Sequence, residues 1–199
     1  MTAVRTHWMI ALAAAALATS AAAQVKPDSE RFLEAIEQQR NDEVIELVTK
    51  RGRAIINTRG YSGATPLTVA MRKRAIPYVG YLLQNGADPN LGDRNGDTAL
   101  MIAARLGYVE GINAMLVARA AGDATNRQGE TALIFAVHNR HVQAVKRLLE
   151  AGASPTRTDS ASGLSARDYA QRDRRSGEIL KLIDLVKPKP VFVAGPIIE

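Results

Sequence analysis

The chain has 199 residues, 46% of them hydrophobic, which is enough for one domain with a real core but too little for two large ones. Its 26 basic and 20 acidic residues give a formal net charge of +6, a moderate excess that favours acidic partners without specifying them. The absence of cysteine excludes disulfides, a thiol nucleophile and a lipoprotein anchor.

Residues 1–23 have the composition of a secretory signal peptide. Arg5 gives a positive start, residues 9–18 form an apolar run, and three alanines at 21–23 precede a cleavage site. The run is about half the length needed to span a bilayer, so a cleaved signal is favoured over a membrane helix. Its alanine-rich composition is typical of bacterial export. We therefore expect a periplasmic product with no stable membrane insertion, starting with a short linker at 24–28 and carrying a net charge of +5, because the removed segment contains one arginine and no acid.

Residues 29–60 are predicted to form a degenerate first unit of two helices. Their apolar residues keep helical spacing at Ala35, Val44 and Leu47. The segment lacks the threonine motif that appears later in the chain. Its polar residues suit an N-terminal cap, which has a neighbour on one side only.

From residue 61 the chain repeats itself every 33 residues. GATPLTVA begins at residue 63, GDTALMIA at 96 and GETALIFA at 129, and SGLSARDYA follows one residue late as a fourth copy. A fixed period of about 20 to 50 residues indicates stacked units. The units are 61–93, 94–126, 127–159 and 160–184, the last being a C-terminal cap.

Each unit is predicted to contain two helices. A glycine stands where a tight turn needs positive φ, and the threonine or serine after it caps the first helix. These caps are Thr65, Thr98, Thr131 and Ser165. Further apolar residues at helical spacing mark a second helix, which ends at Gly86 in the second unit and at Gly152 in the fourth.

The third unit departs from this pattern. Arg119 stands where its neighbours have Gly86 and Gly152. Glycine is the residue that suits the left-handed end of a helix. The second helix of this unit is therefore expected to run on to Gly122, and the following loop is expected to differ in shape.

TPLTVA at 65–70, NGADPN at 85–90 and the period of 33 residues resemble the ankyrin repeat family. The resemblance covers residues 29–184. It implies an all-α repeat solenoid of about five stacked helix-turn-helix units joined by short β-turn loops. It also implies a non-enzymatic scaffold whose concave side, made of loop tips and the exposed face of each first helix, binds another protein.

Carrying this surface over position by position gives a predicted binding row. Seven residues after each capping residue stand Arg72, Arg105, His138 and Arg172, with Lys73 beside the first, and the matching loop tips carry Tyr61, Arg94 and Arg127. We expect the row to bind an acidic protein surface, with Tyr61 as an aromatic anchor. Asp97, Glu130 and Asp173 are close enough in sequence to neutralise part of it.

Catalytic motifs are missing from the sequence. It has no GxxxxGK phosphate loop, no GxGxxG after a strand, and no pair of carboxylates placed for acid–base chemistry. His138 and His141 lie three residues apart, but two histidines without a nearby carboxylate or cysteine make a poor metal site. We expect no enzyme activity, no cofactor and no metal, and we expect no nucleic-acid ligand because the chain is exported.

Residues 185–199 form a proline-rich apolar tail. Pro188, Pro190 and Pro196 exclude a helix, while Val191–Val193 are apolar for a chain end. The tail either covers the last unit or adds to a partner.

The function expected is a monomeric, non-enzymatic protein-binding module of the periplasm. Two alternatives stay open: an inhibitor or immunity protein against a toxic enzyme, and a binder of an anionic envelope polymer.

Overall fold

The structure is a computed structural model that describes residues 26–185, and these contain ten α-helices, one short 3₁₀ helix and no strand. The helices come in pairs: α2 (Asp28–Glu37) with α3 (Asn41–Arg51), α4 (Pro66–Arg72) with α5 (Ile76–Gln84), α6 (Ala99–Arg105) with α7 (Val109–Val117), α8 (Ala132–His138) with α9 (Val142–Glu150), and α10 (Ala166–Arg172) with α11 (Gly177–Leu185). The 3₁₀ helix η1 (Gly52–Ile55) follows α3. The predicted all-α repeat solenoid is confirmed. The predicted signal peptide (1–23) and residues 186–199 of the predicted tail lie outside the described residues.

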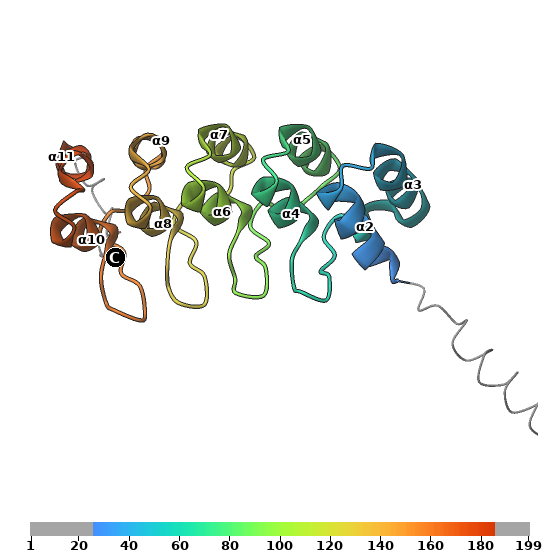
Figure 1. Cartoon of the computed structure of the whole chain (residues 1–199), viewed down its shortest axis with the longest axis horizontal. Coiled ribbons are helices and arrows are strands. Elements are labelled where there is room, and N and C mark those ends of the chain that lie inside the picture. Colours follow the sequence, from blue (N-terminus) through green and yellow to red (C-terminus); the bar gives the residue numbers. More distant parts are fainter. Residues whose placement is uncertain (1–25, 186–199) are drawn as a thin grey trace, which may run out of the picture.

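The five pairs stand side by side in one row (Figure 1). The first helix of each pair, from α2 to α10, belongs to an inner layer, and the second helix, from α3 to α11, belongs to an outer layer. Neighbouring inner helices contact one another from α2 to α10, and neighbouring outer helices do so from α5 to α11. Helix α3 is joined to α5 by a hydrogen bond from the Tyr78 hydroxyl to Asn41. The loops that join successive pairs extend from the inner layer, away from the outer one.

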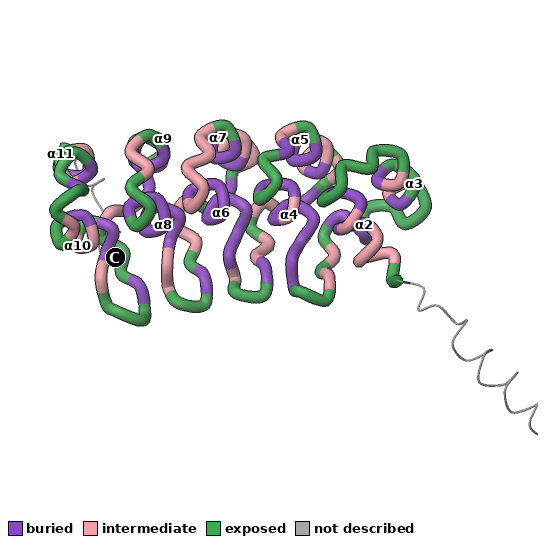
Figure 2. The backbone as a smooth tube through the Cα atoms, viewed as in Figure 1, coloured by how far each residue is buried: buried purple, intermediate pink, exposed green. Residues whose placement is uncertain are grey.

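A single hydrophobic core runs through the row (Figure 2). The inner helices supply most of it, since residues 99–104 of α6 and 132–137 of α8 are all buried. One alanine recurs at the same place in each of the last four units and is at most 2% exposed: Ala70, Ala103, Ala136 and Ala170. Because alanine has a small side chain, the neighbouring helices can approach closely there.

The predicted helix starts are confirmed. Each capping hydroxyl accepts a hydrogen bond from the backbone N–H three residues on, at 3.2 Å for Thr65, 3.4 Å for Thr98, 3.2 Å for Thr131 and 3.2 Å for Ser165. The turn glycines two residues before these caps have positive φ, between 65° and 81°. A residue with a Cβ would be strained in that backbone conformation, which explains why glycine recurs.

The predicted extension of the third unit's second helix is wrong. Helix α7 ends at Val117, at the same place as α5 and α9, and Arg119 itself adopts the left-handed conformation with φ 59°. Its N–H donates to the carbonyl of Leu116 at 3.0 Å, and the N–H of Ala120 donates to Met115 at 2.9 Å. Ala120 is buried, so the packing of the stack fixes where the helix ends. A non-glycine residue in this conformation costs about 1–2 kcal/mol, which the packing overrides.

The loop after α7 also keeps the shape of its neighbours. Three loops are joined to the next by the same hydrogen bond, in which an Asn or Asp side chain accepts from a backbone N–H 31 residues on. The pairs are Asn57 with Asp88 at 2.8 Å, Asn90 with Ala121 at 2.7 Å, and Asp123 with Ser154 at 2.8 Å. Arg119 therefore substitutes for glycine without altering the repeat.

Two glycines in the outer layer should respond to alanine in opposite ways. A Cβ at Gly80 of α5 would meet nothing within 4 Å, so Gly80→Ala should raise stability by about 0.5–1 kcal/mol through helix propensity. A Cβ at Gly111 of α7 would lie 2.5 Å from Met71 Sδ and 2.6 Å from the Tyr108 ring, so Gly111→Ala should lower stability by about 1 kcal/mol. Denaturant midpoints of both variants check this, and equal shifts would contradict the packing around α7.

Candidate functional site

Four members of the predicted row occupy one structural position. Arg72, Arg105, His138 and Arg172 are the last residues of the inner helices α4, α6, α8 and α10. The loop tips carry the exposed Tyr61, Arg94 and Arg127. The face formed by these helix ends and loop tips is called the inner face below.

The loop tips are tied to one another. The guanidinium of Arg94 donates a hydrogen bond to the carbonyl of Tyr61. The backbone N–H of Arg127 donates to the carbonyl of Asn95 at 3.0 Å, and Ser160 donates likewise to Gln128 at 2.7 Å. These bonds hold successive tips next to one another, so a partner would meet them as one surface.

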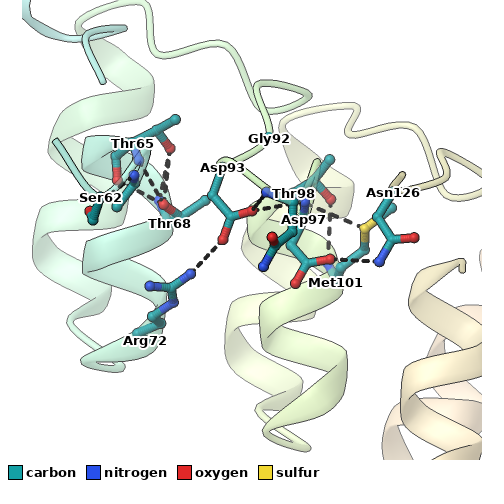
Figure 3. A network of polar contacts seen from close by, with 12 residues as sticks. Ser62, Thr65, Thr68, Arg72, Gly92, Asp93, Asp97, Thr98, Met101 and Asn126 are labelled. Carbon is teal, nitrogen blue, oxygen red and sulfur yellow. Dashed lines mark hydrogen bonds and ion pairs between the residues drawn. The ribbon is translucent and has the colours of Figure 1, made fainter. Parts of the chain in front are cut away.

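Two arginines of the row already bind acidic side chains of the loops. Arg72 Nη2 lies 2.5 Å from Asp93 Oδ2, as Figure 3 shows, and Arg105 Nη2 lies 2.6 Å from Asp97 Oδ2. The aspartate side chains are only 6% and 3% exposed, whereas the arginine side chains are 49% and 40% exposed. These arginines therefore neutralise buried carboxylates while keeping part of their surface in water.

The other cations of the row divide into two groups. Lys73 Nζ lies 3.1 Å from Glu37 Oε1 on α2. Within residues 26–185, no carboxylate lies within 4 Å of the side-chain nitrogens of Arg94, Arg127 or Arg172. The uncompensated part of the row thus belongs to the third, fourth and fifth units.

Sequence reasoning missed the buried polar residue that shapes the loop before α6 and the loop before α8. Asp93 Oδ1 accepts from the N–H of Asn95 at 2.8 Å and of Asp97 at 3.1 Å, and Asn126 Oδ1 accepts from Gln128 at 3.0 Å and Glu130 at 2.9 Å. Figure 3 shows how Asn126 Nδ2 then donates to Asp97 at 2.8 Å and so links two loops. The signal was present, because an Asp or Asn stands three residues before each of the turn glycines 96 and 129.

Row residues also contact the next unit. The Arg105 guanidinium carbon lies 4.0 Å from the centre of the Phe135 ring, which allows a cation–π contact. The His138 and Tyr169 rings lie 4.0 Å apart, and the Tyr169 hydroxyl donates to Asp159 Oδ2 at 2.5 Å. The row therefore also helps to hold the stack together.

The Asp159 carboxyl stays ionised although it is buried. Burial by itself would raise its pKa, but hydrogen bonds from the Tyr169 hydroxyl and from the backbone N–H groups of Ser162, Ala161 and Gly163 lower the pKa below its usual value. Burial and the bond to Asp159 raise the pKa of Tyr169. The pair fixes the ring against which His138 packs.

A cavity of about 1090 Å³ lies at the N-terminal end of the inner face. We call it the N-terminal trench. Its lining comes from α2, from the loop before α4, and from α4: Lys26, Pro27, Glu30, Leu33, Glu34, Glu37, Gln38, Tyr61, Ser62, Ala64, Val69, Arg72 and Lys73. It contains three residues of the predicted row, and sequence reasoning missed its acidic wall on α2.

Close contact between α2 and the next loop closes one side of the trench. Gly60 permits this contact, since a Cβ there would lie 2.3 Å from Leu33 Cδ1. The N–H of Tyr61 then donates to Glu30 Oε2 at 2.9 Å. Glu34 accepts from Lys26 at 2.7 Å, and this hydrogen bond is the main reason why the pKa of Glu34 is lowered.

Two family models match the sequence. One, described as "Ankyrin repeats (3 copies)", covers residues 87–159, and the other, described as "Ankyrin repeat", covers residues 62–94. The chain belongs to the ankyrin repeat family. Ankyrin repeats are generally protein–protein interaction modules and are typically not enzymes. No curated protein matches the chain in sequence.

The polar contacts on the inner face are ion pairs and hydrogen bonds. Residues 26–185 contain no group of three or more His, Asp or Glu side chains placed to hold a metal ion. None of their helices is both long enough and apolar enough to cross a bilayer. What the inner face presents is a set of charged side chains, one exposed tyrosine and hydrogen-bonding loop tips.

Loss of the Asp97 carboxylate should destabilise the stack. Asp97→Ala removes the acceptor for both Arg105 and Asn126, and hydrogen bonds to a buried charge contribute about 1.5–3 kcal/mol. Asp184→Ala is the control, since its ion pair with Arg167 is about half exposed and should contribute less than about 0.5 kcal/mol. Denaturant unfolding measures both, and equal losses would show that the buried pair adds nothing.

Asp159 should make the stability of the C-terminal units fall in acid. The pKa of Asp159 is lower in the folded chain than in the unfolded chain, where it is near 3.9. The ionised carboxylate therefore stabilises the fold at pH values above its unfolded pKa. This contribution is lost as the pH falls through the pKa of the folded state. Asp159→Asn should therefore flatten the dependence of unfolding free energy on pH below about pH 4. Denaturant titrations at several pH values measure this. If the unfolding free energy of Asp159→Asn fell in acid as steeply as that of the wild type, the prediction would be contradicted.

Proposed function

We propose that this chain is a non-enzymatic protein-binding module of the periplasm, and that its inner face binds an acidic surface of a protein partner. The family supports protein binding in general. Export rests on the sequence of residues 1–23.

The proposal rests on one observation: some cations of the row are paired with carboxylates of the chain and others are not. Arg72 and Arg105 are held by Asp93 and Asp97, but Arg94, Arg127 and Arg172 have no carboxylate within 4 Å among residues 26–185. Exposed cations without an internal carboxylate can bind carboxylates of another molecule without first breaking an ion pair. The third to fifth units are therefore the part of the inner face best suited to an acidic partner.

The geometry supports a preformed surface. Arg127 lies in a loop tip that is hydrogen-bonded to the tip before it, and the His138 ring packs on Tyr169. Both features limit the conformational freedom that binding would have to remove. A preformed row of charges favours fast association with a complementary surface, at a rate that falls as salt rises.

Neutralising the uncompensated cations should weaken partner binding without unfolding the chain. The bait is residues 24–199, used to capture proteins from a periplasmic extract, after which the partner is purified and its dissociation constant is measured. The variant Arg94→Gln/Arg127→Gln/Arg172→Gln should weaken binding by at least about tenfold, and wild-type binding should weaken as salt rises.

A matched control changes the same net charge elsewhere. Lys50→Gln/Lys146→Gln/Lys181→Gln removes three exposed cations from the outer helices α3, α9 and α11 and should leave the dissociation constant unchanged. Equal loss in both variants, or affinity that does not depend on salt, would rule out the inner face as an electrostatic site. Capture of a toxic enzyme that the chain inhibits would favour the inhibitor role, and retention of anionic polymer alone would contradict a protein partner.

A further inference from the structure

A small recess of the inner face lies between α8 and α10, in the part of the row where cations lack an internal carboxylate. It has a volume of about 220 Å³ and is lined by Val137, His138, Tyr169, Arg172 and Asp173. We call it the α8–α10 recess. Sites for separate small molecules usually have about 300–1,000 Å³, so this recess is sized for a single side chain of a partner.

Two residues of the row line the recess from opposite helices. His138 is the last residue of α8, and Arg172 is the last residue of α10. Both side chains are exposed, and no carboxylate oxygen of residues 26–185 lies within 4 Å of their side-chain nitrogens. Their N–H groups can therefore bind a carboxylate that comes from another molecule.

The acid in the lining is already paired within the chain. Asp173 Oδ1 accepts from the N–H of Arg175 at 3.0 Å, and Oδ2 accepts from the Ser176 hydroxyl at 2.9 Å. Arg140 Nε lies 3.2 Å from the same Oδ2. These hydrogen bonds and the nearby guanidinium charges lower the pKa of Asp173. Asp173 is thus compensated, and the charge of Arg172 is not.

The aromatic wall of the recess is held in place by hydrogen bonds. The His138 and Tyr169 rings lie 4.0 Å apart, and the Tyr169 hydroxyl lies 2.5 Å from Asp159 Oδ2 and 2.9 Å from Ser162 Oγ. Val137, which is 2% exposed, adds an apolar group to the lining. An acidic side chain has matching parts, because a short aliphatic stem precedes its carboxylate.

We propose that the α8–α10 recess binds one glutamate or aspartate side chain of the acidic partner, an inference that rests on the proposed function. Arg172 forms an ion pair with the carboxylate, and the His138 ring donates a second hydrogen bond to it. The aliphatic stem packs beside the Tyr169 ring. The partner thus places one acid at a fixed point of the inner face, which gives the electrostatic contact a defined register.

His138 makes this contact depend on pH. The equivalent residues Arg72, Arg105 and Arg172 keep their charge, whereas histidine gains its charge between about pH 5 and pH 8. A protonated ring attracts the carboxylate more strongly than a neutral ring does. Because glutamate remains mostly ionised above about pH 5, binding becomes tighter as the pH falls from about 8 to about 5.5.

Charged and titratable groups of several elements surround the His138–Tyr169 pair. They are Arg105 at the end of α6, Glu130 and Asp159 in the loops before α8 and α10, Arg140 in the turn after α8, and Asp168, Arg172 and Asp173 in or next to α10. Arg105 is paired with Asp97, and Arg140 is paired with Asp173. The Asp168 carboxylate accepts two bonds from Ser165 at the start of α10. Arg172 is therefore the cation of this set with which a further carboxylate can pair.

Titration with a probe that has one carboxylate tests the recess without the partner. The probe is a glutamate blocked as its N-acetyl N-methylamide, so that the side-chain carboxylate is its only charge. It is added to isotope-labelled residues 24–199, and ring and methyl NMR signals are followed at about pH 5.5 and about pH 8. We expect saturable shifts at Val137, His138 and Tyr169, with binding about two- to fivefold tighter at the lower pH.

Two single substitutions and one matched control separate the roles of the cations. Arg172→Gln should weaken probe binding about threefold, whereas Arg174→Gln removes the same charge outside the lining and should bind as the wild type does. His138→Gln retains a hydrogen-bond donor but cannot gain a proton in this range, so its affinity should be the same at both pH values. All three positions are exposed, so the denaturant midpoints of the variants should stay close to that of the wild type.

Four results would overturn the proposal. The first three are the absence of saturable binding, equal weakening by Arg172→Gln and Arg174→Gln, and equal binding of the blocked glutamine analogue. The fourth is displacement of the probe by inorganic phosphate at a lower concentration than by free blocked glutamate, which would assign the recess to a phosphorylated group. A pH dependence that persists in His138→Gln would overturn the role of His138.

The partner experiment keeps this inference distinct from the proposed function. If Arg94→Gln/Arg127→Gln/Arg172→Gln weakens partner binding while the probe does not bind, the inner face takes an acidic partner and the recess proposal is wrong. If the probe binds as expected while partner binding ignores both the triple variant and salt, the carboxylate site stands and the proposed function is wrong.

Discussion

Each inner helix depends on the helices beside it to keep its side chains from water. Six of the seven residues of α6 and of α8 are buried, which leaves only the last residue of each helix for any other role. A short helix with so little polar surface is stable only within the stack. Burial within the stack therefore leaves the helix ends and the loop tips as the places where a partner can bind, and each unit supplies one of each.

Because only the helix ends and loop tips are accessible, the side chains that could bind a partner also form contacts that stabilise the fold. The loops contain Asp93 and Asp97, whose carboxylates are almost fully buried and need donors, because an uncompensated buried charge is costly. Arg72 and Arg105 are the nearest helix-end residues and supply those donors. A cation in the row is therefore not by itself a binding residue, and its role depends on whether a loop acid lies within reach.

The fold could be predicted from sequence because its rules are local. A threonine before an apolar run caps a helix, and a glycine in a tight turn has positive φ, whatever the rest of the chain does. Arg119 shows the limit of that reasoning. Local preference favoured a longer helix, but burial of Ala120 and the Asn90 hydrogen bond to Ala121 fix the end of α7 at the position shared by the other units.

The candidate site was harder to predict because its charges pair across loops. Arg72 and Asp93 are 21 residues apart, and Lys73 and Glu37 are 36 apart, so no helical spacing reveals either pair. Counting positions from each capping residue correctly predicted that the row residues are equivalent. The same counting assumed that all units are alike. The first unit is not like the others, since α2 has ten residues where α4 has seven and carries glutamates where the later inner helices end in arginine or histidine.

The two end units of the stack differ in how they meet solvent. An end unit has a neighbour on one side only, so its exposed side has to be polar or covered. At the N-terminal end, ion pairs such as Arg31 with Glu43 at 2.9 Å and Arg51 with Asp28 at 2.5 Å keep the surface polar. At the other end, α11 finishes with Leu185, which is 77% exposed, and an apolar stretch of sequence follows. Ion pairs therefore keep the first unit polar where it lacks a neighbour, whereas the last helix of the described chain ends on an exposed leucine.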